Sequence, residues 1–179
     1  PVSVLKAAKA VTWDWHMAAN KAYVDDNFVD LAVPAHATER VKMQQDDYGL
    51  FLTIEDIAEL IHPDDQSDFQ VKMMAHLSGQ TPIFEAEYRA YGSTNDLRWV
   101  FNRGSITERD KNGTPARMLG SIIDVTELVE LRGDLKRQKE LLEAVTANLV
   151  GAIYRYALFP DGKDKVVYLS QGAEQLFGI

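Results

Sequence analysis

The residues of this chain that could do chemistry are its histidines and its many carboxylates. The histidines, which share no spacing typical of a metal site, are His16, His36, His62 and His76. His62 is followed by Asp64 and Asp65, and this trio could be interpreted as a ligand cluster. Pro63 favours a simpler interpretation, in which one helix ends here and Asp64 caps the next. We therefore expect neither a metal site nor catalytic residues.

Composition excludes several further classes of chemistry. The chain has 179 residues, a formal net charge of −8 and no cysteine. Without cysteine there is no disulfide framework, no thiolate zinc site and no flavin–cysteinyl photochemistry. No phosphate-binding glycine loop and no Ser/His/Asp pattern occur in the sequence. The acidic balance without a basic cluster predicts no nucleic-acid partner. No apolar run is long enough to span a bilayer, so we expect no membrane contact in this chain.

Three successive strands organise the middle of the chain. Residues 83–91 alternate between apolar and charged side chains with the period of two that a half-buried strand requires. Residues 97–108 and 118–125 are the next two strands, and Asn112-Gly113 predicts a hairpin turn between them. Gly104 lies inside the second strand and indicates a bulge or a close approach of another group. Such a meander needs a cover for its apolar face.

The residues before the meander supply that cover. Residues 35–48 are polar and mixed and allow no secure prediction. Thr53 and Asp56 form a capping-box pattern that opens a helix ending near His62, and Gly79 is a candidate C-cap of the helix that follows. Before the meander we expect a flanking helix over 1–10, strands over 11–16 and 22–24, and helices over 27–31, 54–61 and 66–77.

A regular apolar spacing begins after the third strand. The positions that follow this 3-4 spacing are Leu128, Leu131, Leu135, Gln138, Leu142, Val145 and Leu149. It predicts a coiled-coil helix and a homodimer through residues 128–149, and the alternative is a single helix packed on its own domain. After Gly151 the strand–turn–strand order of residues 11–31 recurs. We therefore expect residues 150–179 to begin a second, truncated domain of the same kind.

Several short motifs in residues 11–127 resemble those of the PAS domain family. In order they are Trp13-Asp14-Trp15, the Ile61-His62-Pro63-Asp64-Asp65 loop, Glu87-Tyr88-Arg89, Arg98-Trp99-Val100, and Gly120 through Asp124-Val125-Thr126-Glu127. The polar stretch 35–48 is longer than is usual in that family. The resemblance implies an α+β fold with a five-stranded antiparallel sheet, short helices on one face and a long C-terminal helix. The implied parts are a flanking helix at 1–10, a PAS domain at 11–126, a coiled-coil linker at 127–149 and a second PAS start at 150–179.

The resemblance implies a cytoplasmic sensory module of a bacterial signalling protein. Such a module senses a small molecule or mediates dimerisation, and passes the signal through its C-terminal helix. The chain itself lacks the motifs of a kinase or a cyclase, so we expect no enzyme activity from it. Its parent would be a sensor histidine kinase or a diguanylate cyclase or phosphodiesterase. The alternatives are an interaction module without a ligand, and a flavin- or haem-bound redox or light sensor.

An apolar pocket between the sheet and its helices is the candidate ligand site. Its implied wall consists of Trp15, Tyr23, Phe28, Ile57, Ile61, Phe69, Met73, Phe84, Tyr88, Trp99, Phe101 and Ile122. For each of these residues, ordinary core packing is the alternative role. Asp124 and Thr126 have side chains suited to hold the end of the last strand by hydrogen bonds. The implied signal junction comprises these two residues with Leu128, Leu131 and Leu135.

The sequence assigns no cofactor to this pocket. A flavin held without a covalent bond stays open, because the sheet offers aromatic side chains and the family includes flavin binders. Haem is disfavoured. His76 lies on the helix that carries the ligand in haem-binding PAS domains, but it lies nearer to the end of that helix than their ligand does.

Overall fold

The computed structural model describes residues 10–37, 44–148 and 154–169. The chain divides into two compact units, Pro1–Glu127 and Leu128–Ile179, which are described separately below. Residues 1–9 of the expected flanking helix and the last residues of the expected second domain lie outside the described residues, and Ala10 begins a strand rather than ending a helix.

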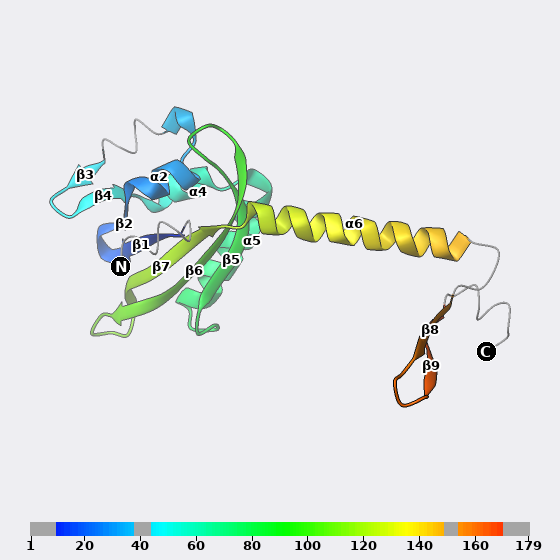
Figure 1. The fold of residues 1–179 in the computed structure, drawn as a ribbon. Coiled ribbons are helices and arrows are strands. Elements are labelled where there is room, and N and C mark those ends of the chain that lie inside the picture. Colours follow the sequence, from blue (N-terminus) through cyan, green and yellow to red (C-terminus); the bar gives the residue numbers. More distant parts are fainter. Residues whose placement is uncertain (1–9, 38–43, 149–153, 170–179) are drawn as a thin grey trace. The chain divides into compact units, whose positions relative to one another are not determined.

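One antiparallel sheet forms the body of the first unit (Figure 1). Its strands are β1 Ala10–His16, β2 Lys21–Val24, β3 Gln45–Asp46, β4 Gly49–Leu52, β5 Phe84–Tyr91, β6 Leu97–Arg109 and β7 Pro115–Asp124. The seven strands lie in the order β3-β4-β2-β1-β7-β6-β5. The α+β fold is confirmed, but the sheet has two strands more than expected. The extra pair, β3 and β4, comprises two and four residues. Strands this short show too little alternation to be recognised, and β3 also lies within the polar stretch 35–48.

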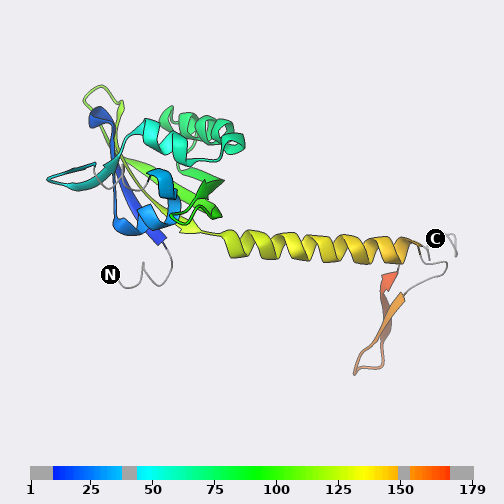
Figure 2. The same ribbon diagram turned by 90° about the horizontal axis from the view of Figure 1, so that it is seen from above.

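Three helices cover one face of this sheet (Figure 2). They are α2 Asp26–Ala32, α4 Ile54–Leu60 and α5 Pro63–Leu77, and a short 3-10 turn, Met17–Ala19, links β1 to β2. The expected capping box at the start of α4 is present, since Thr53 Oγ1 accepts from the Asp56 N–H and the Asp56 carboxylate accepts from the Thr53 N–H. Gly79 follows α5 with a φ of +82°, which is the conformation of a C-terminal glycine.

The start of α5 differs from the expectation. The helix begins at Pro63 rather than at residue 66, and His62 rather than Asp64 is its N-cap. The His62 Nδ1 accepts a hydrogen bond from the Asp64 N–H at 3.3 Å. Proline is favoured at the first position of a helix because its nitrogen needs no acceptor there. Pro63 was expected to end the preceding helix, but it is the first residue of α5.

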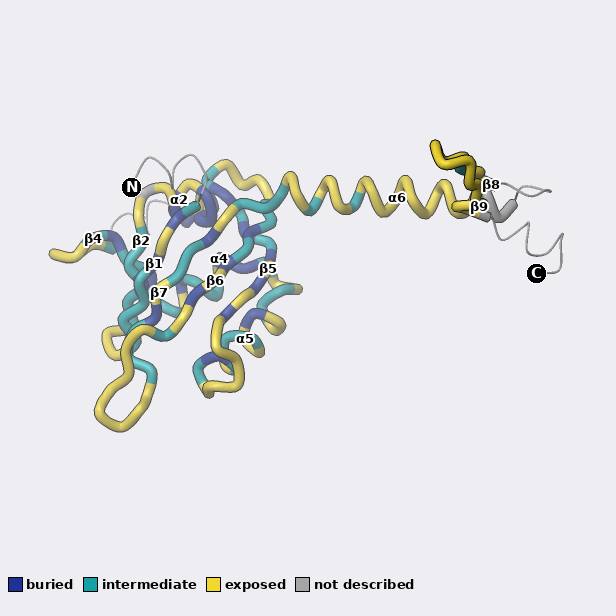
Figure 3. The backbone as a smooth tube through the Cα atoms, turned by 60° about the horizontal axis from the view of Figure 1, so that its bottom comes forward, coloured by how far each residue is buried: buried dark blue, intermediate teal, exposed yellow. Residues whose placement is uncertain are grey.

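The core lies between the inner face of the sheet and the three helices (Figure 3). Along β5 the inward side chains are almost completely buried and alternate with more exposed charged residues. The largest side chains that water does not reach are Phe84, Leu52, Met118, Val29, Val33 and Val100. Burial of apolar area on this scale is what holds the helices on the sheet.

The second unit consists of most of α6 and a hairpin. Helix α6 spans Thr126–Asn148, and strands β8 Tyr154–Leu158 and β9 Asp164–Leu169 pair antiparallel around Gly162, which has a φ of +81°. Among the described residues, no helix combines the length and apolarity needed to cross a membrane. That this unit includes the start of a second PAS domain stays a prediction.

Candidate functional site

The Trp13 ring packs closely against two glycines at the centre of the sheet, Gly104 and Gly120, here called the glycine floor. A Cβ atom on Gly104 of β6 would lie 2.5 Å from the Trp13 ring, and one on Gly120 of β7 would lie 2.2 Å from it. Gly104 and Gly120 are directly paired across the two strands. The sequence predicted a bulge or a close approach of another group at Gly104. The structure shows a close approach, made by the Trp13 indole ring. Only glycine at both positions lets the ring rest on the sheet.

A buried chain of hydrogen bonds starts at this ring. The Trp13 Nε1 donates to Asn102 Oδ1 at 2.9 Å, and Asn102 Nδ2 donates to the Tyr88 hydroxyl at 3.2 Å. Burial raises the pKa of Tyr88 to about 12, so the hydroxyl keeps its proton at neutral pH. The sequence analysis missed Asn102. The alternation in β6 puts Asn102 on the same face as Val100, but only the pairing of Val100 with Tyr88 shows that this face is the inner one.

An internal cavity lies beside this chain. It has a volume of about 40 Å³ and is lined by Trp13, Trp15, Ala22, Val24, Phe28, Ile54, Ile57, Phe69, Met73, Tyr88, Asn102 and Ile122. Drug-sized ligands occupy roughly 300–1,000 Å³. A flavin ring or a haem therefore does not fit the cavity in this conformation. His76 is buried and its Nδ1 contacts the Thr81 carbonyl oxygen at 2.9 Å, but it is not among the residues that line the cavity.

Most of the pocket residues expected from the sequence lie around this cavity or next to it. Those that line it are Trp15, Phe28, Ile57, Phe69, Met73, Tyr88 and Ile122. Ile61 lines an adjoining hollow of about 390 Å³ between α4 and α5, here called the α4–α5 groove. Phe84 does not line the cavity itself but packs against Phe69, which does. The two rings meet edge-on with centroids 5.4 Å apart.

Three expected pocket residues lie elsewhere. Tyr88 pairs with Val100 across β5 and β6, so Val100 shares the inner face with Tyr88. Trp99 and Phe101, which flank Val100, consequently belong to the outer face. Tyr23 follows the buried Ala22, and its hydroxyl contacts Asp46 Oδ2 at 3.1 Å, away from the cavity. The expectation failed for these residues because aromatic character does not say which face of a strand a side chain occupies.

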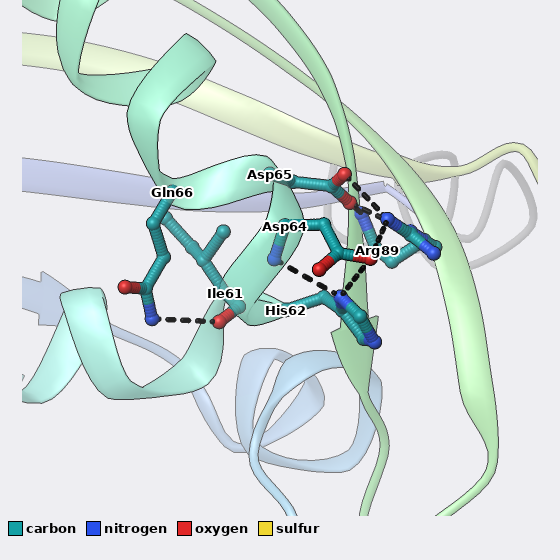
Figure 4. Close-up of polar contacts among 6 residues, drawn as sticks. All are labelled: Ile61, His62, Asp64, Asp65, Gln66 and Arg89. Carbon is teal, nitrogen blue, oxygen red and sulfur yellow. Dashed lines mark hydrogen bonds and ion pairs between the residues drawn. The ribbon is translucent and has the colours of Figure 1, made fainter.

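The His62-Pro63-Asp64-Asp65 corner closes the open edge of the sheet (Figure 4). β5 is an edge strand, and the backbone groups of its Arg89 are bound by this corner. The His62 N–H donates to the Arg89 carbonyl at 2.8 Å, and the Arg89 N–H donates to Asp65 Oδ2 at 2.9 Å. Within the described residues no group of three histidine or carboxylate side chains could hold a metal ion. The corner therefore supplies hydrogen-bond partners to the backbone of an edge strand.

Arg89 also connects the corner to the end of the last strand. Its side chain binds both oxygens of Asp65, and its guanidinium lies 5.5 Å from the centroid of the Trp99 ring. The Arg89 guanidinium holds the pKa of the Asp65 carboxyl below its usual value. The Trp99 backbone N–H donates to Thr126 Oγ1 at 3.0 Å, and its carbonyl accepts from the Val125 N–H at 2.9 Å. A continuous set of contacts thus leads from α5 to the start of α6.

The end of β7 is held by its own side chains. Asp124 Oδ1 accepts from the Thr126 N–H at 2.9 Å, and Thr126 Oγ1 accepts from the Trp99 N–H. These are the hydrogen bonds expected of the two residues. Beyond them, Leu128, Leu131 and Leu135 of α6 are exposed by 46%, 58% and 69%. Among the described residues, these three leucines give α6 an exposed apolar side.

A larger and more open hollow of about 540 Å³ lies near the same junction. Its wall contains the carboxylates of Asp30, Asp96 and Asp124, and two of these bind neighbouring groups. Asp96 pairs with Arg98, and Asp124 binds the Thr126 N–H. Open and polar, this hollow offers less to an apolar ligand than the internal cavity does.

Comparison with known proteins matches residues 46–122 to the model of the PAS fold. This segment runs from β3 into β7 and includes the corner, Arg89, Asn102 and both floor glycines. No curated protein matches the chain significantly.

Several solved structures are similar to this chain. A sensory box histidine kinase/response regulator from Burkholderia thailandensis is 27% identical, with a TM-score of 0.60, and the match covers 80% of this chain and 97% of that one. An RNA-binding light-oxygen-voltage receptor is 15% identical with a TM-score of 0.50, over 78% of this chain and 34% of that one. The N-terminal domain of a diguanylate cyclase with a PAS/PAC sensor from Marinobacter aquaeolei is 19% identical with a TM-score of 0.49, over 65% and 95% of the two chains.

Proposed function

The chain contains a domain of the PAS family, and we propose that it is the sensory and regulatory region of a bacterial signalling protein. PAS domains are sensor modules rather than catalysts, so the output belongs to another domain. The similarity to a sensory box histidine kinase supports a kinase output, and a cyclic-di-GMP enzyme is the other candidate. Because both outputs consume nucleotides, we propose that the protein works in the cytoplasm.

One observation carries this proposal, namely the hydrogen-bonded junction between β6, β7 and α6. Trp99 binds both Val125 and Thr126 through its backbone, so the start of α6 is fixed to the strand next to β7. Asp124 closes the same turn. A change in the sheet that moves Trp99 would therefore alter where α6 begins. This is the connection that a sensor needs between its pocket and its output.

The apolar side of α6 supports a homodimer through residues 128–149. The seam positions Leu135 and Leu142 are exposed by 69% and 64%, and Val145 by 51%. Exposed apolar area is unfavourable in water, and a 3-4 repeat buries it against a second helix. A paired helix has few packing arrangements, so a small shift at the junction selects between discrete states. A ligand drives such a shift only through different affinities for the two states.

Single-cysteine cross-linking tests this proposal directly, because the chain contains no cysteine to remove. We expect Leu135→Cys to form a disulfide-linked dimer under mild oxidation, since a parallel seam brings each residue next to its copy. Glu140→Cys, on the opposite side of the helix, is the matched control and should cross-link poorly. Equal cross-linking at both positions, or a monomer by analytical ultracentrifugation at all concentrations, would refute the dimer.

The small internal cavity favours a second candidate function. A volume of about 40 Å³ is also what a filled core would leave, and the domain would then set only the geometry of the dimer. Native mass spectrometry separates the two functions, because a sensor retains or takes up a small molecule. The visible absorption spectrum of the purified protein tests the flavin and haem alternatives.

A further inference from the structure

The internal cavity and the α4–α5 groove share part of their lining. Both hollows are lined by Trp15, Ile54, Ile57, Phe69 and Met73. The groove is lined in addition by Ala58, Ile61, Gln66, Gln70, Met74 and Leu77. A rotation of one of these shared side chains is the smallest movement that would join the two hollows.

Met73 is the shared side chain best suited to such a rotation. Methionine is unbranched and has three rotatable bonds, so it changes shape more easily than the aromatic residues around it. Met74, which is exposed by 64%, lies at the mouth of the groove. The helices on both sides are held in place, since the Gln66 side chain of α5 donates to the carbonyl oxygens of Ala58 and Ile61 at 3.0 and 3.1 Å. Met73 can therefore change its conformation while these hydrogen bonds keep the two helices together.

The lining of both hollows contains no charged side chain. A carboxylate or phosphate buried there would lose its hydration without gaining a countercharge. An uncharged molecule has no such penalty. The apolar walls favour a ligand made mostly of carbon.

Two hydrogen-bond donors inside this lining lack an acceptor. The Trp15 Nε1 is buried and has no partner among the described residues, whereas the Trp13 Nε1 is bound to Asn102. An indole N–H can only donate. The Tyr88 hydroxyl accepts from Asn102, and its own hydrogen has no acceptor within the described part of the chain. Buried donors normally have partners, so these two point to an acceptor atom supplied from outside.

We propose that the internal cavity and the α4–α5 groove form one binding site for a small, uncharged, mainly apolar molecule that bears a hydrogen-bond acceptor such as a carbonyl oxygen. The molecule enters between α4 and α5, displaces Met73, and accepts a hydrogen bond from the Trp15 Nε1. This inference rests on the proposed sensory function and adds the class of molecule that is sensed.

The indole N–H signals of the intact chain test the proposal. The chain has three tryptophans, so the nitrogen–proton spectrum contains three indole signals, and Trp15→Phe identifies the one from Trp15. The probes are 2-hexanone, hexanoate and hexane, which share a chain length and differ in the acceptor and the charge. We expect 2-hexanone to shift the Trp15 signal downfield in a saturable manner. Hexane should bind without that shift, and hexanoate should bind at least tenfold more weakly than the ketone, roughly the effect of one uncompensated polar interaction.

Two variants and one control complete the test. Trp15→Phe removes the donor and part of the ring, so it should weaken 2-hexanone binding by about tenfold more than it changes hexane binding. Met73→Trp should fill the passage and abolish binding. Val71→Trp, at a position of α5 that is exposed by 66% and lines neither hollow, should bind as the unaltered chain does.

Each other outcome overturns the inference. Hexanoate binding as tightly as the ketone would exclude an uncharged ligand class, and full binding by Met73→Trp would place the site elsewhere. If no probe binds and the Trp15 N–H contacts only water, the cavity is a hydrated core. The cross-linking of α6 does not depend on these results, so a failure here is distinct from a failure of the proposed dimeric signalling function.

Discussion

The Arg89 guanidinium binds both oxygens of the Asp65 carboxylate, with the Nη2 at 2.7 Å from Oδ1 and the Nε at 2.8 Å from Oδ2. The Arg89 backbone N–H donates to the same Oδ2. One carboxylate at the start of α5 therefore binds both the side chain and the backbone of the edge strand. Since α5 also lines the cavity, this pair fixes the position of the cavity wall relative to the sheet.

Replacement of Asp65 measures the strength of this attachment. We expect Asp65→Asn to lower the free energy of unfolding by about 1–2 kcal/mol at pH 7, because charge-assisted hydrogen bonds are lost but solvent already screens the pair. Asp64→Asn is the matched control, since the Asp64 side chain is 72% exposed and contacts the Arg89 Nη2 at 3.3 Å. Urea unfolding of both variants decides the matter, and equal losses would show that Asp65 has no special role.

Acid should weaken the same attachment. The pKa of the Asp65 carboxyl is lowered by its hydrogen bonds to Arg89 from the ordinary value of 3.8. A carboxyl with a lowered pKa in the folded state adds stability above its unfolded pKa, and this stability is lost as the pH falls through the folded value. We therefore expect a loss of stability below pH 3.8 that is smaller in Asp65→Asn. Thermal unfolding between neutral pH and pH 3 measures it, and parallel curves for the two proteins would contradict it.

Thr126 offers a direct probe of the junction. Thr126→Val keeps the shape of the side chain but removes the acceptor of the Trp99 N–H. We expect this amide to exchange with solvent roughly threefold to tenfold faster, as the loss of one neutral hydrogen bond implies. Thr126→Ser keeps the hydroxyl and should exchange like the unaltered chain. Hydrogen exchange followed by NMR gives both rates. If the Trp99 amide kept full protection in the valine variant, the Thr126 side chain would not hold the start of α6 to β6.

The sequence predicted the fold wherever side-chain alternation was strong. Phe84, Ala86, Tyr88 and Ala90 were assigned to one face of a strand, and all four are buried. The period alone could not decide the face in β6, where aromatic residues alternate with a valine and an asparagine. That choice is made by pairing, because Tyr88 lies opposite Val100.

The N-cap of α5 and two contacts between residues far apart in the chain were not predicted. His62 caps α5 because Pro63 starts it, and the local pattern allowed Asp64 as well. The Trp13–Asn102 hydrogen bond joins residues 89 positions apart, so no local pattern could reveal it. Gly104 was recognised as unusual, but the indole ring that requires it is supplied by a different strand.

The glycine floor under Trp13 leads to the sharpest stability prediction. In Gly120→Ala the new methyl group would lie 2.2 Å from the Trp13 ring and 2.5 Å from the backbone oxygen of Arg103, so ring and strand must both shift. We expect a loss of about 1–3 kcal/mol, as for other overpacked cores.

Gly133→Ala is the matched control. Gly133 lies in α6, and its nearest neighbour is the end of the Arg137 side chain at 3.8 Å. Alanine there should not destabilise α6 and should favour it by about 0.5–1 kcal/mol, because glycine is a poor helix former. Urea unfolding of both variants, with the Trp13 indole signal as a local probe, provides the comparison. If Gly120→Ala unfolded like the unaltered protein with an unshifted Trp13 signal, the Trp13 ring would not pack against Gly120. The position of Trp13 in the cavity lining would then be wrong.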